Sequence, residues 1–236
     1  MTNRPFLHPA TIFFLLTLLV AFLSWVGSIY GWHDVQSLLS AEGLRWQLRN
    51  TVPGFLQAPF LGHLLILAFG IGLWIHSGLG AFCFRLFMRH NRLSRKEKRA
   101  FGWSLAVGGV FLAGCIVLAW GPWSLVRSIT GGLKHSPLAD GCTYLVSLGL
   151  GIMALVYGYA VDYYHTDRDL VRGLSYAFVR FSEYFITLFF IVQFFSSFHY
   201  TGLDVFFGFS PAFFHGCYVI CILSVSYTHL TLPTIL

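Results

Sequence analysis

The sequence predicts an all-α integral membrane protein with about five to six transmembrane helices and one amphipathic helix at the membrane interface. Two observations predict this class. Of the 236 residues, 56% are hydrophobic and 10% are charged, with a mean hydropathy of +0.70, whereas soluble domains carry about 25% charged residues on their water-facing surfaces. In addition, five apolar segments reach the length of about 20 residues that a helix needs to cross a bilayer.

No soluble domain or long linker separates the apolar segments, so residues 1–224 are predicted to form one polytopic membrane domain. A sixth segment, roughly 205–224, contains Gly208, Ser210 and Pro211, and we expect it to form a partial span or a re-entrant piece. The five predicted spans are roughly 10–31, 60–84, 102–122, 141–161 and 174–198.

Residues 33–58, between the first two spans, have a different pattern. Leucine, tryptophan and valine residues are interleaved there with Glu42, Arg45 and Arg49. This amphipathic pattern favours a helix lying at the outer interface of the membrane; a solvated loop is the alternative.

The segment 93–103 is predicted to be a cytoplasmic loop that leads into the third span. Ser94 is a candidate helix N-cap, and Glu97 follows it by three residues. This spacing is typical of a capping box, in which the two side chains bind each other's backbone N–H groups.

Lysine and arginine are distributed unevenly, which predicts the orientation, because basic residues stay on the cytoplasmic side. Seven of the fifteen lie between Arg85 and Arg99. With the amino terminus in the cytoplasm, ten basic residues are inside, namely Arg4, those seven, Arg168 and Arg172. Four are then outside, namely Arg45, Arg49, Arg127 and Lys134.

Three polar residues interrupt the fifth predicted span and are the candidate residues of a transport path. Arg180 and Glu183 are three positions apart, so on one helix they share a face and can pair near the cytoplasmic end. Gln193 lies deeper and has no charged neighbour at helical spacing. It either bonds another helix or lines a path for a polar solute.

The chain contains no pattern of catalytic residues, metal ligands or phosphate-binding glycines, and we expect neither an enzyme nor a metal site. The five cysteines form no CxxC pair, and the ten histidines are scattered. The net charge of +6 is concentrated in one loop, and no soluble domain remains to bind nucleic acid. Glycines cluster inside the second, third and fourth spans, where they permit either close helix packing or hinges.

Three stretches resemble the aminobenzoyl-glutamate transporter (AbgT) family. The first is "SLLSAEGLRWQLRN" (37–50) followed by "GIGLWIHSGLG" (70–80). The second is "SPLADG" (136–141) followed by "LVYGYAVDYYHTDRDLVRG" (155–173). The third is "FFIVQFFSSFHYTGLD" (189–204).

The resemblance implies a homodimeric secondary transporter in the bacterial inner membrane, driven by an ion gradient of H⁺ or Na⁺. Its solute would be p-aminobenzoyl-glutamate or a related aromatic acid or antimetabolite, and it would need no other cofactor. Among polar positions, the resemblance covers Gln193 and the cytoplasmic motif Asp167–Arg168–Asp169. Arg180 and Glu183 match no family pattern.

Two departures from the family accompany the resemblance. Family members carry further helices and a hairpin between the "SGL" and "EKR" motifs, which are almost adjacent here, so we expect a short or truncated member. The second is at the end of the chain, where "VSYTHLTLPT" (225–234) can be encoded by a sequence that resembles a sequencing-library adaptor. We therefore expect residues 225–236 to be an artefact. A non-transporting membrane protein, either a degenerate remnant or a helix-packing partner, is the alternative function.

Overall fold

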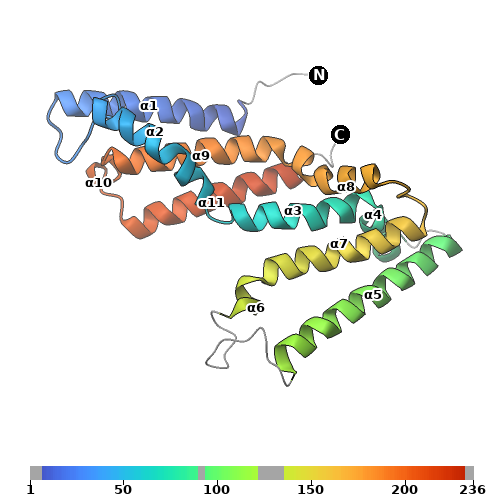
Figure 1. Cartoon of the computed structure of the whole chain (residues 1–236). Coiled ribbons are helices and arrows are strands. Elements are labelled where there is room, and N and C mark those ends of the chain that lie inside the picture. The colour runs from blue at the N-terminus through green and yellow to red at the C-terminus, as the bar shows by residue number, and fades with distance from the viewer. Residues whose placement is uncertain (1–6, 90–93, 122–135, 232–236) are drawn as a thin grey trace, which may run out of the picture. The chain divides into compact units, whose positions relative to one another are not determined.

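The computed structural model describes residues 7–89, 94–121 and 136–231, and in these ranges the chain forms helices and no strands (Figure 1). The chain divides into two compact units. Unit 1 combines the two ends of the chain, residues 1–61 and 181–236, and unit 2 is the continuous segment 62–180. Four of the basic residues counted for the predicted orientation lie outside the described residues, namely Arg4, Arg92, Arg127 and Lys134.

The helices of each unit follow the apolar segments of the sequence. Unit 1 contains α1 (Pro9–Ile29), α2 (Ala41–Leu56), α9 (Ser182–Tyr200), α10 (Leu203–Phe206) and α11 (Pro211–Thr231). Unit 2 contains α3 (Leu61–His76, from Gly62 onward), α4 (Leu79–Phe84), a π-helical turn (Arg85–Arg89), α5 (Arg95–Trp120), α6 (Pro137–Asp140), α7 (Cys142–Ala160) and α8 (Asp167–Arg180).

Three of the predicted spans are continuous helices. In the described residues, α1, α5 and α7 are each long and apolar enough to cross a membrane. Two broken pairs, α2 with α3 and α8 with α9, also pass this test when each is taken together, which gives up to five spans. The prediction of an all-helical membrane protein is confirmed.

The predicted fifth span, 174–198, is wrong as one continuous helix. The chain leaves helical geometry at Phe181, between the end of α8 at Arg180 and the start of α9 at Ser182. The sequence on the two sides differs in character: α8 mixes charged and apolar residues, whereas α9 is apolar over most of its length. A uniform apolar run therefore begins only after Arg180.

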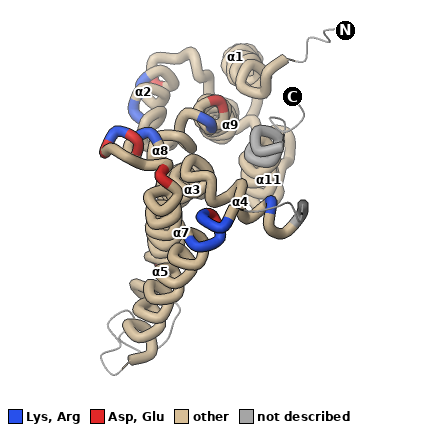
Figure 2. Tube along the Cα trace, turned by 90° about the vertical axis from the view of Figure 1, so that its right-hand side faces the viewer, with Lys and Arg blue, Asp and Glu red and all other residues tan. Residues whose placement is uncertain are grey.

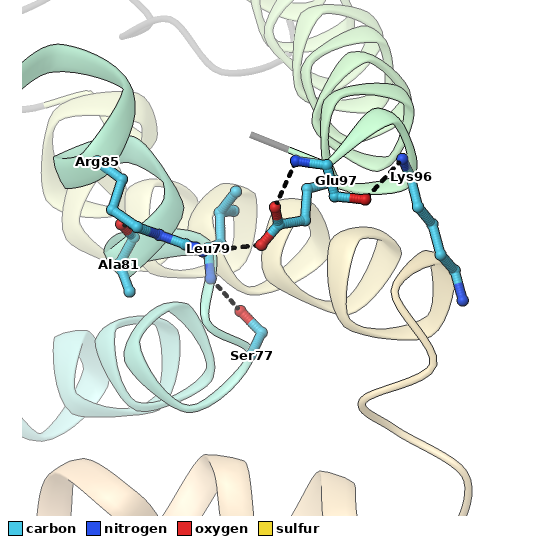
Figure 3. Close-up of polar contacts among 7 residues, drawn as sticks. Ser77, Leu79, Ala81, Arg85, Lys96 and Glu97 are labelled. Atoms are coloured by element: carbon cyan, nitrogen blue, oxygen red, sulfur yellow. Dashed lines mark hydrogen bonds and ion pairs between the residues drawn. The ribbon is translucent and has the colours of Figure 1, made fainter. Parts of the chain in front are cut away.

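The predicted second span is also divided, at Ser77 and Gly78, between α3 and α4. The hydroxyl of Ser77 accepts a hydrogen bond of 3.3 Å from the backbone N–H of Leu79 and so binds the first turn of α4 (Figure 3). A polar residue next to glycine is a common point of interruption in a membrane helix, because the side chain replaces a lost backbone bond.

In the sixth apolar segment, the interruption lies before Pro211 and not within a helix. Pro211 is the first residue of α11, a position where the missing N–H costs nothing. The Ser210 hydroxyl accepts a hydrogen bond of 3.3 Å from the N–H of Phe213, which satisfies one free donor of the first turn. The helix then continues through Val225 to Thr231.

The amphipathic segment 33–58 does contain a helix, α2, whose N-cap is Ser40. Two aromatic contacts show how α2 lies in unit 1: Trp46 stacks on Tyr200 at 4.1 Å between ring centroids, and Phe55 meets Phe189 at 5.5 Å. Because the residue numbers rise on α2 as they fall on α9, the helices are antiparallel neighbours. Helix α2 therefore packs alongside α9, and its location at the outer interface of the membrane stays a prediction.

The predicted capping box at the start of α5 is confirmed. The Ser94 hydroxyl and the Glu97 carboxylate both bind backbone N–H groups of this turn. Glu97 also accepts a hydrogen bond of 2.8 Å from Arg85 (Figure 3). The charged residues of α5 gather at this end, and the rest of the helix is uncharged (Figure 2).

Unit 2 is packed around close contacts between α3, α5 and α7. The Ser147 hydroxyl on α7 accepts a hydrogen bond of 3.0 Å from the N–H of Gly70 and donates one to the carbonyl of Ile66. A Cβ atom at Gly70 would lie 2.3 Å from the backbone oxygen of Ser147. At this position, glycine permits close packing of α3 and α7, one of the two roles expected for the glycines.

We predict that Gly70→Ala destabilises the protein by about 1–3 kcal/mol, because the new methyl group must displace the α7 backbone. Gly109→Ala in α5 is the matched control, since a Cβ atom there meets nothing within 4 Å. The control should leave stability unchanged or raise it by about 0.5–1 kcal/mol through helix propensity. Thermal unfolding in detergent, followed by circular dichroism, measures both, and equal melting temperatures would contradict the packing argument.

Candidate functional site

Unit 1 contains a cavity of about 710 Å³ between the end of α9, α10 and the start of α11. Four of its eleven lining residues are Phe or Tyr and four are Ser, His or Asp, and such a mixture of aromatic and polar groups is typical of small-molecule sites. It is lined by Phe195, Ser196, His199, Asp204, Val205, Gly208, Phe209, Ser210, Pro211, Phe214 and Tyr218.

A sharp turn of the chain forms one end of this cavity. After α9, Gly202 adopts a φ of +72°, and a Cβ atom there would lie 2.2 Å from the carbonyl oxygen of Asp34. The residue before Gly202 is bonded to the loop before α2, because the N–H of Gln36 donates a hydrogen bond of 3.0 Å to the carbonyl of Thr201. Only glycine satisfies both requirements at position 202, and the turn places α10 beside the end of α9.

The turn brings His199 and Asp204 together in the cavity wall. The distance between His199 Nδ1 and Asp204 Oδ2 is 2.6 Å. The two residues differ in exposure: 72% of the His199 side chain is exposed, against 8% of that of Asp204. The second carboxylate oxygen, Asp204 Oδ1, is buried and has no hydrogen-bond partner in the part of the chain that the structure describes.

Aromatic rings continue around this pair. Phe195 contacts Phe214 and Tyr218 at 5.3 and 5.1 Å between ring centroids, which joins α9 to α11. On the side of the loop before α2, Trp32 stacks on Phe206 of α10 at 4.6 Å, with an interplanar angle of 3°. The packing of α10 and α11 on α9 is therefore largely aromatic.

Gln193 belongs to a polar cluster between α2 and α9 and does not line the 710 Å³ cavity. Its side chain is 7% exposed, and its Oε1 accepts a hydrogen bond of 2.8 Å from Gln47 Nε2. The amide also lies 3.4 Å from the hydroxyl and the carbonyl of Thr51, and Ser197 donates a bond of 3.3 Å to Gln47. Of the two roles considered, bonding another helix is the one that these contacts show.

Arg180 and Glu183 do not share a face of one helix, because the interruption at Phe181 separates them. Arg180 is the exposed last residue of α8 in unit 2. Glu183 is exposed in the first turn of α9 in unit 1, where its Oε2 lies 3.9 Å from His8 Nε2. The geometric basis for the predicted pair is therefore lost.

The motif Asp167–Arg168–Asp169 forms the start of α8 in unit 2. Asp169 Oδ2 accepts hydrogen bonds from the N–H of His165 and from the N–H and hydroxyl of Thr166, at 2.9–3.2 Å. These bonds satisfy free donors at the helix start. Asp167 and Arg168 are exposed, and a transport role for the motif stays a prediction.

A second ion pair connects the loop before α8 to the start of α5. Lys96 Nζ donates a hydrogen bond to Asp162 Oδ2. This bond, together with the charge of Lys96, lowers the pKa of the Asp162 carboxyl. The predicted cytoplasmic loops of unit 2 are thus joined by charge pairs, since Arg85 and Glu97 form another.

Sequence reasoning missed the His199–Asp204 pair. His199 is one of ten scattered histidines and Asp204 is one residue of the "FFIVQFFSSFHYTGLD" stretch, and the sequence predicted neither as a site residue. The available signal was a single aspartate within the apolar run "GLDVFFGF" (202–209). An ionisable group in such a segment indicates a partner or a function.

We predict that Gln47 and Gln193 are energetically coupled. In a double-mutant cycle to alanine, the coupling energy should be about 0.6 kcal/mol and at most about 1.7, as for other hydrogen bonds between membrane helices. Asn50 is the matched control, because its amide donates to Trp46 of its own helix. A cycle between Asn50 and Gln193 should give no coupling in detergent unfolding. Equal values for both cycles would contradict the assignment.

Comparisons with known proteins agree with the membrane architecture. A model of the AbgT putative transporter family matches residues 85–215, more than half of the chain. No curated protein matches the chain significantly.

Two solved structures share the fold of the chain. The YdaH transporter of Alcanivorax borkumensis is 18% identical, with a TM-score of 0.69 over 84% of this chain and 72% of that one. Neisseria gonorrhoeae MtrF, from a class of antimetabolite efflux pumps, is 15% identical, with a TM-score of 0.73 over 85% of this chain and 71% of that one. By its family match and its fold, this multi-pass membrane protein belongs to the AbgT putative transporter family.

Proposed function

We propose that the protein is a secondary transporter of p-aminobenzoyl-glutamate or related aromatic acids and antimetabolites, driven by an ion gradient. The observation that carries this proposal is the aromatic cavity of unit 1, in a chain whose family is one of transporters. The antimetabolite efflux described for the class of MtrF supports the same type of solute.

The cavity is suited to a solute with one flat apolar part and one polar part. Phe195, Phe214 and Tyr218 offer ring faces and edges on which an aromatic ring can stack or form edge contacts. Ser196, Ser210 and His199 supply polar groups in the same walls. At about 710 Å³, the cavity is within the usual range for small-molecule sites.

The setting of this activity is also part of the proposal. The protein would act in a bacterial inner membrane as a homodimer, with its amino terminus in the cytoplasm. The gathering of Lys and Arg at the start of α5 supports the orientation, because such residues remain on the cytoplasmic side (Figure 2). Import and export are both compatible with the proposal.

We predict gradient-dependent flux of radiolabelled p-aminobenzoyl-glutamate in proteoliposomes that contain the purified protein. Flux should appear when an H⁺ or Na⁺ gradient is imposed and should stop when an ionophore dissipates it. Phe214→Leu removes a ring from the cavity and should raise KM about two- to tenfold, which corresponds to the 0.5–1.5 kcal/mol of an aromatic contact.

Phe22→Leu is the matched control, because Phe22 is 56% exposed on α1 and does not line the cavity. Its KM should equal that of the wild type. Absence of flux in the wild type, with the protein shown to be inserted in the vesicles, would defeat the transport proposal and favour a non-transporting membrane protein.

A further inference from the structure

The carboxylate of Asp204 is half satisfied in the structure. Oδ2 is paired with His199, but Oδ1 is buried and no donor among the described residues reaches it. Leaving a buried charged oxygen without a hydrogen bond is costly, and native proteins keep such groups for a reason. The pair with His199 accounts for Oδ2, but no contact among the described residues accounts for Oδ1.

Three kinds of partner could satisfy Oδ1: a donor on a solute, a metal cation or a proton. The oxygen is buried, so a solute in the cavity does not reach it. A hard cation needs several oxygen ligands around it. Among the described residues Asp204 is not part of a group of three His, Cys, Asp or Glu side chains, so backbone carbonyls or water would have to supply most of these ligands. A proton needs one lone pair and almost no space.

We propose that Asp204 and His199 form a proton-binding site in the wall of the unit 1 cavity. His199 connects this site to water, because most of its side chain is exposed while that of Asp204 is covered. In one state, the imidazolium donates its Nδ1–H to Oδ2 of the ionised carboxylate. When that proton moves across the 2.6 Å contact, neutral imidazole and a neutral carboxylic acid result, with no change in total charge.

The empty site lacks this shared proton and consists of neutral imidazole beside the carboxylate, a pair with a charge of −1. Addition of one proton from water gives the loaded site, which is neutral overall whether the proton is on nitrogen or on oxygen. Loading and release therefore change the charge of the cavity wall by one unit, which alters the binding of an anionic solute.

Other titratable groups lie on the elements around the pair. On α11, Tyr218 lines the same cavity and His215 is exposed. In the loop before α2, the exposed Asp34 presents its carbonyl to Gly202. On α2, Glu42, Arg45 and Arg49 line a separate cavity together with Tyr200.

This inference rests on the proposed function and names H⁺ as the coupling ion and its binding residues. In a gradient-driven transporter, the ion must bind in one orientation and leave in the other. The pair lines the cavity that would hold the solute. The charge of the pair, which depends on the bound proton, would therefore change the affinity of the cavity for the solute.

The test combines infrared spectroscopy with flux on the intact protein. Because the chain has nine Asp and Glu residues, the reading is a difference: as the pH is lowered in lipid vesicles, the wild type should gain the carbonyl band of one buried carboxylic acid, and Asp204→Asn should lack this band. Asp34→Asn is the matched control, because Asp34 is an exposed aspartate of the same unit with a φ of +62°, which asparagine accepts. Its spectrum should retain the band.

Solute flux is the second measurement, after infrared spectroscopy. An imposed pH gradient should accelerate uptake of labelled p-aminobenzoyl-glutamate by the wild type and by Asp34→Asn. In Asp204→Asn this acceleration should be lost, whereas exchange of labelled for unlabelled solute without a gradient should continue. That exchange also shows that the variant is folded.

The possible failures are distinguishable. An infrared band that survives in Asp204→Asn, or flux that follows Na⁺ and ignores this substitution, would overturn the proton site and leave transport intact. If no variant and no wild-type protein shows flux, the transport proposal fails, and the infrared titration alone then decides whether Asp204 binds a proton.

Discussion

The organisation of unit 1 depends on one constraint: a polar side chain on an apolar helix must find its partner on another element. Helix α9 carries Gln193 and His199 among mostly apolar neighbours, and each is met from elsewhere. Gln47 of α2 binds Gln193, and Asp204 of α10 binds His199. Because surrounding lipid offers no alternative donors or acceptors, these two contacts fix which faces of α9 the neighbouring elements cover.

The same constraint separates the two polar positions by role. In the Gln47–Gln193 contact, both side-chain amides have hydrogen-bond partners within the cluster, and Gln193 is 7% exposed. In the His199–Asp204 contact, by comparison, the imidazole ring is exposed, and Asp204 Oδ1 has no hydrogen-bond partner among the described residues. The hydrogen-bonded amides therefore stabilise packing, whereas the His199–Asp204 pair can still change its protonation state.

Much of the fold could be predicted from the sequence, because hydropathy and helix-capping patterns are local. The continuous spans α1, α5 and α7 and the capping box of Ser94 and Glu97 follow from such patterns. The start of α11 at Pro211 is a local feature of the same kind, because proline is favoured as the first residue of a helix. The interruption at Phe181 was not predicted, because the end of α8 (174–179) is already mostly apolar and conceals the change from the charged start of α8 to the apolar α9.

The candidate site was less predictable than the fold. Gln193 stood out by its polarity, but its partner is 146 positions away in the chain, and no local pattern identifies Gln47. For Asp204, the decisive facts are the turn at Gly202 and the depth of the carboxylate, which depend on the loop before α2. Long-range contacts of this kind are properties of the folded unit.

The construction of unit 1 from both ends of the chain has a consequence for biosynthesis. Helices α1 and α2 are made first, but α9, on which they pack, is made only after the whole of unit 2. At about 5–20 residues per second, the 146 positions between Gln47 and Gln193 correspond to a delay of about 7–30 seconds. During this interval Gln47 lacks its partner on α9, and the order of synthesis therefore favours completion of unit 2 before unit 1 can close.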